Sequence, residues 1–329
     1  MVSIEMLREA QQRIASVAVR TPLVRFFPGL SGNPDKRRLF LKLESLQPIG
    51  SFKLRGAFNM IASLATEQRQ RGIITYSSGN HAQAVAYTAR ALSIPAVIVM
   101  PNNAPAVKVE ATRALGAEIV VVGAASSERQ QKAEQIAAER GLTMVPPYSD
   151  ERIIAGAGTA AMEILEDMPE IECVLAPVSG GGLLSGIATA VKLQRPDIKV
   201  IGVEPELAAD AQESLRSGEL VTWPAEMTVR TICDGLRTQS LGAVNFEHIR
   251  MHVDDIVTVS EQQIRSAVRA LAIQGRVIAE PSGAACIAAL LYAADKLPQA
   301  TRYAAVVSGG NIVPQLLGEI LAEGQAAKA

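Results

Sequence analysis

Short apolar runs rich in β-branched residues alternate with segments of helical character along most of the chain, and this alternation restricts the possible folds more than any other feature. The first such runs are GIITYS, PAVIVM, AEIVVV and LTMVP, at residues 72–77, 95–100, 117–122 and 142–146. They are too short and too β-branched for helices, so we expect buried strands. The segments of helical character between them lie at 80–92, 105–115 and 126–140. Because strands joined through helices run parallel, this series predicts a parallel twisted sheet with helices on both faces.

A second series of the same kind follows in the C-terminal half. Its expected strands are ECVLAPV, IKVIGVE, DIVTVS and YAAVVS, at residues 172–178, 198–204, 255–260 and 303–308. We therefore predict an α/β protein of two doubly wound domains, each with a parallel twisted sheet. The larger domain would comprise residues 1–68 and 146–329, and the smaller one residues 69–145. The turn-rich segment VPPYSD, at 145–150, marks the boundary.

The composition argues against several other classes of protein. A length of 329 residues fits about two domains, and a formal net charge of −1 with a pI near 6.4 lacks the basic character of a nucleic-acid-binding protein. The longest apolar run, at 284–294, is too short to cross a bilayer, and the N-terminus is unlike a signal peptide. Cys173, Cys233 and Cys286 are too scattered for a disulfide framework or a zinc cluster. We expect a cytoplasmic protein that binds small metabolites, with no nucleic-acid or membrane partner.

Three glycine-rich loops each follow an expected strand and open an expected helix. They are SSGNHAQ, VSGGGLLSG and VSGGNIVP, at residues 77–83, 178–186 and 307–314. In open α/β sheets, ligands bind at the carboxyl ends of the strands, where helix N-termini present free N–H groups. All three loops occupy that position, so the sequence predicts a ligand site there.

The loop at 179–183 is the best candidate for binding an anion. Its residues are Ser179, Gly180, Gly181, Gly182 and Leu183. Three successive glycines leave no Cβ in the way, so the backbone N–H groups can converge on one phosphate. No GK[ST] ending and no GxGxxG fingerprint is present, which favours a single cofactor phosphate over a triphosphate. A simple tight turn is the alternative.

Lys53 is the most unusual charged residue of the sequence. It lies in LQPIGSFKLRGAFNM, at 46–60, where Ser51, Phe52 and Gly56 surround it with a tight apolar segment. A partly desolvated lysine has a lowered pKa and can form a Schiff base, although most lysines are solvated surface charges. The segment SGNH, at 78–81, brings a hydroxyl, an amide and an imidazole to a helix start, where helix capping is the simpler explanation.

Four motifs taken together resemble a known family. GSFKLRGA, SSGNHAQ, SGGGL and SGGN, at 50–57, 77–83, 179–183 and 308–311, resemble in order and spacing the pyridoxal-phosphate enzymes of the tryptophan-synthase-β fold, fold type II. Within that group the chain resembles the threonine/serine dehydratase and serine racemase family, from about residue 5 to residue 322. The resemblance implies pyridoxal 5′-phosphate as cofactor, a homodimer, and a small mobile domain that closes over the substrate.

The resemblance also implies how the cofactor is held. Lys53 would bind its aldehyde and act as the catalytic base, and Phe52 would lie beside it. Asn80 would hydrogen-bond the phenolic oxygen, the loop 179–183 would hold the 5′-phosphate, and Ser308 would face the pyridine nitrogen. A hydroxyl cannot keep that nitrogen protonated as a carboxylate could, so the ring would be a weaker electron sink. Loss of a β-substituent would then be the preferred outcome.

Further residues are assigned to substrate and metal by the same resemblance. The substrate α-carboxylate would be bound by the 77–81 loop, which comprises Ser77, Ser78, Gly79, Asn80 and His81. In the racemases of the family a serine at the position of Ser78 is a second catalytic group, and Arg129 could contact a second substrate carboxylate. Glu204, the backbone carbonyl of Ala208, and Asp210 would bind Mg²⁺, or Mn²⁺ or Ca²⁺ in its place. Two solvated acids in a surface loop are the alternative.

The expected activity is that of a threonine/serine ammonia-lyase. Such an enzyme eliminates water from a β-hydroxy-α-amino acid and yields a 2-oxo acid and ammonia. A threo-3-hydroxyaspartate dehydratase and a serine racemase are the alternatives within the family, since Arg129 and Ser78 are both present. A β-replacement enzyme is disfavoured by the SSGNH loop, at 77–81. A metabolite-binding protein without catalysis is a more distant alternative, because it would need no lysine at residue 53.

Overall fold

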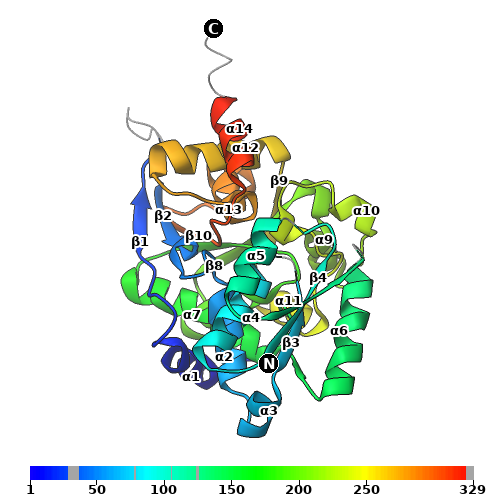
Figure 1. Cartoon of the computed structure of the whole chain (residues 1–329). Helices are drawn as coiled ribbons and strands as arrows, with labels where there is room; N and C mark the ends of the chain where they lie inside the picture. The colour runs from blue at the N-terminus through cyan, green and yellow to red at the C-terminus, as the bar shows by residue number, and fades with distance from the viewer. Residues whose placement is uncertain (29–36, 78, 105, 124–125, 324–329) are drawn as a thin grey trace.

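The computed structural model describes residues 1–28, 37–77, 79–104, 106–123 and 126–323. Within these residues the strands form two separate sheets (Figure 1). The larger sheet has six strands in the order β1-β2-β10-β7-β8-β9, and the smaller has four in the order β5-β4-β3-β6. In the larger sheet β1 (Leu23–Phe26) pairs antiparallel with β2 (Arg38–Leu43), and the other neighbours pair in parallel. All neighbours of the smaller sheet are parallel.

The remaining strands lie close to the expected positions. They are β3 (Ile73–Tyr76), β4 (Ala96–Pro101), β5 (Glu118–Val122), β6 (Thr143–Met144), β7 (Cys173–Pro177), β8 (Lys199–Pro205), β9 (Asp255–Val259) and β10 (Arg302–Val307). The predicted α/β class with parallel sheets is therefore confirmed. Neither β2 nor the antiparallel edge strand β1 was expected, and β6 is shorter than the apolar run at 142–146 indicated. All strands of the smaller sheet fall within residues 69–145, whereas its independence as a mobile domain stays a prediction.

Fourteen α-helices of the described residues surround the two sheets. They are α1 (Ile4–Ile14), α2 (Lys53–Ala62), α3 (Thr66–Arg71), α4 (Asn80–Ala91), α5 (Ala106–Ala114), α6 (Ser126–Arg140), α7 (Glu151–Asp167), α8 (Gly182–Gln194), α9 (Asp210–Ser217), α10 (Ala225–Thr228), α11 (Ala243–His252), α12 (Glu261–Ala270), α13 (Pro281–Tyr292) and α14 (Pro314–Ala322). Local sequence sets several of their starts. The hydroxyl of Ser260 and the side chain of Gln263 form a capping box on α12, and Pro281 and Pro314 lie in the first turns of α13 and α14.

Alternate residues of each buried strand face two different hydrophobic cores, as the two-residue period of a strand requires. Val174 and Ala176 of β7 face the core that contains α1, α7, α8 and α11. Cys173 and Leu175 of the same strand face the core that contains α12 and α13. The smaller sheet is covered by α4 on one face and α6 on the other. Both sheets are thus buried on two sides, which explains their nearly continuous apolar sequences.

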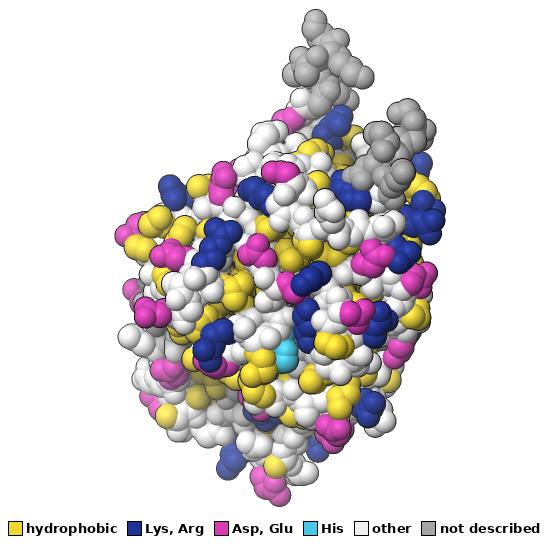
Figure 2. All heavy atoms as spheres, turned by 180° about the vertical axis from the view of Figure 1, so that it is seen from behind, with side chains coloured by type: hydrophobic (Ala, Val, Ile, Leu, Met, Phe, Trp, Pro, Cys, Tyr) yellow, Lys and Arg dark blue, Asp and Glu magenta, His cyan; other side chains and the backbone are white. Residues whose placement is uncertain are grey.

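Polar and charged side chains of both signs are interspersed over the face of the molecule that Figure 2 shows. Among the described helices, none combines the length and the apolar character needed to span a membrane.

Candidate active site

The turn that carries Lys53 is fastened to the loop after β10. Gly50 has a φ of +73°, which favours glycine, and its carbonyl accepts a hydrogen bond from the N–H of Gly310 at 2.9 Å. The N–H of Phe52 donates to the carbonyl of Ser308 at 3.0 Å. Two segments that are far apart in the sequence therefore lie side by side, and Lys53 begins α2 beside buried Ser308.

The amine of Lys53 is partly buried and has an uncharged environment. Its Nζ donates to the backbone carbonyl of Pro147 at 2.7 Å and lies 5.2 Å from the ring centroid of Phe52. Among the described residues no carboxylate lies within ion-pair distance of this amine. Burial lowers the pKa of Lys53 to about 8. An appreciable fraction of the amine is therefore unprotonated near neutral pH and can act as a nucleophile or base.

The glycine loop between β7 and α8 forms a cradle at a helix N-terminus. Gly181 has a φ of +97°, and a Cβ there would lie 2.8 Å from the Cβ of Asn245. A Cβ on Gly180 would lie 2.5 Å from the ring of Tyr148, so the loop has no room for side chains. The hydroxyl of Ser179 is held by Thr238 at 2.6 Å. Within the described residues the N–H groups of the loop find no acceptor, and they suit one phosphate.

The loop lies close to the lysine. Tyr148, which packs on Gly180, directly follows Pro147, whose carbonyl binds the Lys53 amine. The side chain of Asn245 donates to the carbonyl of Tyr148 at 3.2 Å and holds this connecting segment in place. The phosphate cradle and the reactive amine of Lys53 therefore both contact the short segment Pro147–Tyr148.

Asn80, at the start of α4, is held from two sides. Its Nδ2 donates to Oε1 of Glu280 at 2.6 Å, and its Oδ1 accepts from Nδ2 of Asn311 at 2.8 Å. Asn311 also donates to the carbonyl of Ile49, next to the lysine turn. The asparagine loop, the lysine turn and the 308–311 loop thus meet at one place. The segment AEPSGAA, at 279–285, resembles a family segment that lines the cofactor side of the cleft, but sequence reasoning gave Glu280 itself no role.

The imidazole of His81 is engaged with the backbone of the segment that also binds the Lys53 amine. It is buried, and its Nε2 lies 3.1 Å from the carbonyl of Val145. Burial, with a smaller contribution from the charge of Lys53, lowers the pKa of His81 to about 3, so the imidazole is neutral. Ser77 accepts the N–H of Gly79 through its hydroxyl at 3.3 Å. Ser78 lies outside the described residues.

Arg129 lies on α6 close to Tyr76, the last residue of β3. Burial raises the pKa of Tyr76, the charge of Glu134 adds to this effect, and the charge of Arg129 opposes it. Burial also lowers the pKa of Arg129 itself. Tyr76 directly precedes the 77–81 loop, so Arg129 is near that loop from the side of the smaller sheet.

Glu204 and Asp210 are both buried beside buried Ala208. Oε1 of Glu204 accepts the N–H of Gln212 at 2.7 Å, whereas Oε2 of Glu204 and Oδ2 of Asp210 have no hydrogen-bond partner. Burial raises the pKa of both carboxyl groups, that of Asp210 to about 7. No cluster of three or more metal-binding side chains occurs in the described part of the chain. Two unpartnered buried carboxyl oxygens nevertheless fit a hard cation whose other ligands are carbonyls and waters.

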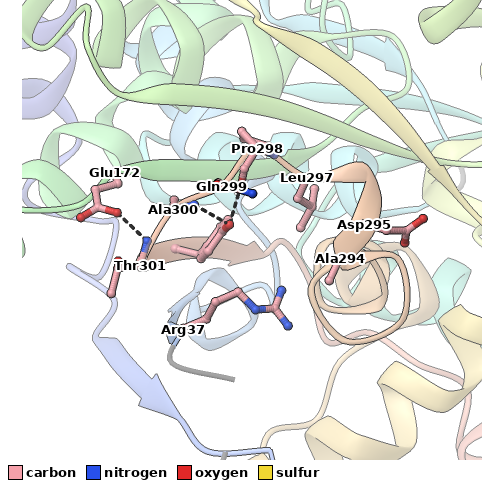
Figure 3. Close-up of a pocket in the computed structure, with 10 residues that line it drawn as sticks. Arg37, Glu172, Ala294, Asp295, Leu297, Pro298, Gln299, Ala300 and Thr301 are labelled. Atoms are coloured by element: carbon pink, nitrogen blue, oxygen red, sulfur yellow. Dashed lines mark hydrogen bonds between the residues drawn. The ribbon is translucent and has the colours of Figure 1, made fainter. Parts of the chain in front are cut away.

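A separate hollow of about 640 Å³ lies at the other end of β10 (Figure 3). Figure 3 shows Glu172 bonded to Thr301, just before β10 begins, whereas Ser308 follows the last residue of that strand. The hollow is therefore distinct from the place where the loops meet.

Comparison with known proteins identifies the class to which this fold and site belong. A family profile described as "Pyridoxal-phosphate dependent enzyme" matches residues 14–309, and the chain belongs to that family. The cradle at 180–182 and the Lys53 amine are consistent with a cofactor that carries one phosphate and one aldehyde.

Within this family, the chain is similar to ammonia-lyases and to a serine racemase. The chain is 39% identical to an L-threonine ammonia-lyase of Thermotoga maritima over 98% of this chain and 79% of the relative. It is 40% identical to an L-threo-3-hydroxyaspartate ammonia-lyase of Saccharomyces cerevisiae over 92% and 91%. A solved structure of maize serine racemase superposes with a TM-score of 0.91 at 37% identity and covers 99% of both chains. The predicted family, fold and ammonia-lyase class are thereby confirmed.

Proposed function

We propose that this enzyme converts a β-hydroxy-α-amino acid, with threonine and serine as the first candidates, to a 2-oxo acid and ammonia. The placement of Lys53 carries this proposal. Its amine has a pKa lowered to about 8 and is fixed between the Pro147 carbonyl, the Phe52 ring and the turn bonded to Ser308. A binding protein would gain nothing from a desolvated lysine, whereas a catalyst needs an amine that can exchange a proton near neutral pH.

The residues around Lys53 have complementary tasks in this proposal. Pyridoxal phosphate, when bound, supplies an aldehyde that combines with amines and a ring that accepts electrons from the substrate α-carbon. The N–H groups of the 180–183 loop would hold the phosphate, Phe52 would lie beside the ring, and Asn80 would donate to the phenolic oxygen. The hydroxyl of Ser308 would face the pyridine nitrogen and would not keep it protonated. Lys53 would take up the α-proton, and the β-hydroxyl would leave as water with a proton supplied by the phosphate or Lys53.

The 77–81 loop binds the substrate α-carboxylate in this proposal. The backbone N–H groups at the start of α4 and the hydroxyl of Ser77 are suited to an anion. The imidazole of His81 is engaged with the Val145 carbonyl, so His81 contributes through its backbone. Ser78 would serve the opposite face of the substrate if the enzyme also racemises serine.

A substrate with a second carboxylate is the alternative. Arg129 lies near the residue that precedes the 77–81 loop, and a guanidinium is suited to bidentate contact with a carboxylate. The yeast relative, named for L-threo-3-hydroxyaspartate, favours including this compound in any substrate panel.

A divalent cation, Mg²⁺ first, is proposed at Glu204, the carbonyl of Ala208, and Asp210. The unpartnered Oε2 of Glu204 and Oδ2 of Asp210 support it, because two buried carboxylates without a cation repel one another. Mg²⁺ should raise the melting temperature of the wild type but not that of Glu204→Gln. Equal shifts in both proteins would place the cation elsewhere.

The resemblance further supports a cytoplasmic homodimer in which the domain of residues 69–145 closes over the substrate. An ion pair of 2.6 Å between Lys108 of α5 and Asp234 links that domain to the rest of the molecule. Free and substrate-bound structures that superpose as one rigid body would contradict closure.

Visible absorbance and product formation test the main proposal. The purified enzyme with added pyridoxal phosphate should show imine absorbance and release 2-oxo acid from threonine or serine. Lys53→Ala should lose both, whereas Lys296→Ala, at an exposed lysine, should lose neither. Imine absorbance without 2-oxo acid from threonine, serine or 3-hydroxyaspartate would refute the proposed reaction. A wild type without imine absorbance would refute the role of Lys53.

A further inference from the structure

Glu280 is a buried carboxyl group at the place where three loops meet. Only 3% of the residue is exposed, and it occupies the N-cap position of α13 without a capping hydrogen bond from its side chain. Its N–H donates to the carbonyl of Gly309 at 3.1 Å, and its Oε1 accepts from Nδ2 of Asn80 at 2.6 Å. The roles proposed above leave this group unused.

The backbone around Glu280 is shaped to admit the carboxyl group. A Cβ on Gly309 would lie 2.3 Å from Oε1 of Glu280 and 3.3 Å from Nδ2 of Asn80. A Cβ on Gly283 would lie 2.2 Å from the carbonyl of Gly309. Glycine at both positions lets α13 and the 308–311 loop approach closely enough to bring Glu280 against Asn80.

The bonds to Asn80 leave one group of its amide unused. Its Oδ1 accepts from Asn311, and one Nδ2 hydrogen goes to Glu280. The second Nδ2 hydrogen finds no acceptor within the described residues. Rotation of the amide by 180° would set its Nδ2 against the donor of Asn311 and its Oδ1 against the carboxyl group of Glu280. The two neighbours together therefore define which side of Asn80 donates.

We propose that Glu280 is a positioning residue that fixes the Asn80 amide as a hydrogen-bond donor to the cofactor and tunes the ionisation of the cofactor imine on Lys53. This inference rests on the proposed role of Asn80 at the phenolic oxygen. A charged acceptor strengthens the bond from Asn80, and a negative charge near the imine favours its protonated form.

The charged and titratable groups around Glu280 place its ionisation near neutrality. Burial raises the pKa of Glu280 to about 7, and the charge of Asp234 adds to this effect. The hydrogen bond from Asn80 and the charge of Lys108 oppose it. The thiol of Cys233 also lies near Glu280, and burial raises the pKa of this thiol well above the usual range. The Glu280 carboxyl group therefore gains its negative charge gradually as the pH rises through about 7.

Glu280→Gln tests the charge without removing the side chain. The glutamine oxygen can still accept from Asn80, so the variant should fold and keep its affinity for pyridoxal phosphate within about threefold. The pH midpoint of the visible absorbance change should fall by about one unit, because the nearby negative charge is gone. Glu172→Gln, at the opposite end of β10, should leave the midpoint unchanged. An unchanged midpoint in Glu280→Gln would overturn the proposed effect on the imine.

Glu280→Ala tests the positioning. It leaves the Asn80 donor without its acceptor and should weaken cofactor binding to the apoenzyme by about tenfold. In an Asn80→Ala background, Glu280→Ala should add little, because Glu280 acts through Asn80. Additive losses would overturn the inference.

The proposed role of Asn80 and the inference about Glu280 can be tested separately. If Asn80→Ala alone leaves cofactor affinity unchanged, the proposed role of Asn80 is wrong. If Asn80→Ala weakens binding and both Glu280 variants do not, only the inference about Glu280 is wrong. Should Glu280→Ala fail to fold, the absorbance midpoint of Glu280→Gln still decides.

Discussion

Replacing Arg55 by methionine should destabilise the protein far more than the same change at a surface arginine with equally close acidic partners. Arg55 is fully buried two residues after Lys53, and its guanidinium contacts Glu44 at 2.8 Å and Glu163 at 2.7 Å. Lys42, also fully buried, contacts Glu163 at 2.6 Å. Two positive and two negative charges are thus enclosed together in a buried ion network that joins β2, α2 and α7.

The magnitude follows from what Arg55→Met leaves behind. Burial alone would raise the pKa of Glu44, but the charge and hydrogen bonds of Arg55, helped by Thr21 and Lys42, hold it below its usual range. Without Arg55, two buried acids share the single charge of Lys42. Removal of one member of a buried ion pair costs about 3–5 kcal/mol. At roughly 2 °C per kcal/mol for a chain of this size, the melting temperature should fall by about 6–10 °C.

Arg20→Met is the matched control. Arg20 also has two acidic partners, Glu166 at 2.6 Å and Asp167 at 2.5 Å, but its side chain is 48% exposed. Exposed pairs contribute about 0.2–1 kcal/mol each, so this variant should lose at most about 2 kcal/mol.

Thermal and urea unfolding of the cofactor-loaded proteins measure the difference. Adding Glu163→Gln to Arg55→Met removes the excess negative charge and should recover part of the loss. Arg55→Met should lower the free energy of unfolding by more than Arg20→Met does, and an equal or smaller effect would contradict the buried network. A further fall in stability when Glu163→Gln is added to Arg55→Met would contradict it as well.

Three further predictions concern the site. Gly181→Ala should weaken binding of pyridoxal phosphate by at least about tenfold, because a Cβ there meets Asn245 at 2.8 Å. Gly218→Ala, at a φ of +76° in open space, should cost only about 1–2 kcal/mol of stability. If Gly181→Ala binds the cofactor as tightly as the wild type, the loop is not the phosphate cradle. The pKa of His81 is lowered to about 3 in the folded protein, from the usual 6.5. The buried neutral imidazole therefore contributes stability that is complete above pH 6.5 and is lost as the pH falls toward 3. His81→Asn should flatten the pH dependence of the free energy of unfolding over that interval, and an unchanged slope would contradict a buried neutral imidazole. If the ion pair between Lys108 and Asp234 favours closure, Lys108→Met should raise KM severalfold with little change in cofactor affinity. Arg113→Met, on the same helix, should leave KM unchanged in the same steady-state measurements.

Sequence patterns predicted most strands that are buried on both faces, although β2, which lies between β1 and β10, was not predicted. The strands β4, β7 and β8 are buried on both faces, so each has a continuous apolar run that contrasts with the helices beside it. The edge strand β1 was missed because it is short, partly exposed and antiparallel, and its pattern does not differ from a loop. The run at 142–146 formed only a two-residue strand, since β6 is an edge strand with one partner, β3.

Some features of the candidate site could also be predicted from the sequence, and others could not. Lys53 and the glycine loop could be found from sequence, because a lysine among apolar residues and three successive glycines are unusual by themselves. Nothing local showed that the imidazole of His81 turns toward Val145, since either direction suits a helix start.

The sequence by itself determined the order of strands and helices, the positions of the glycine-rich loops, and the residue types available for chemistry, because periodicity and backbone freedom are local properties. Only the tertiary structure decided which of those groups meet. Glu280 and Asn311 reach Asn80 from 200 and 231 residues away along the chain, and the lowered pKa of Lys53 arises from burial against segments such as that of Pro147, 94 residues away. Desolvation and hydrogen-bond geometry depend on what surrounds a group in space, and the folding of the chain brings those surroundings together.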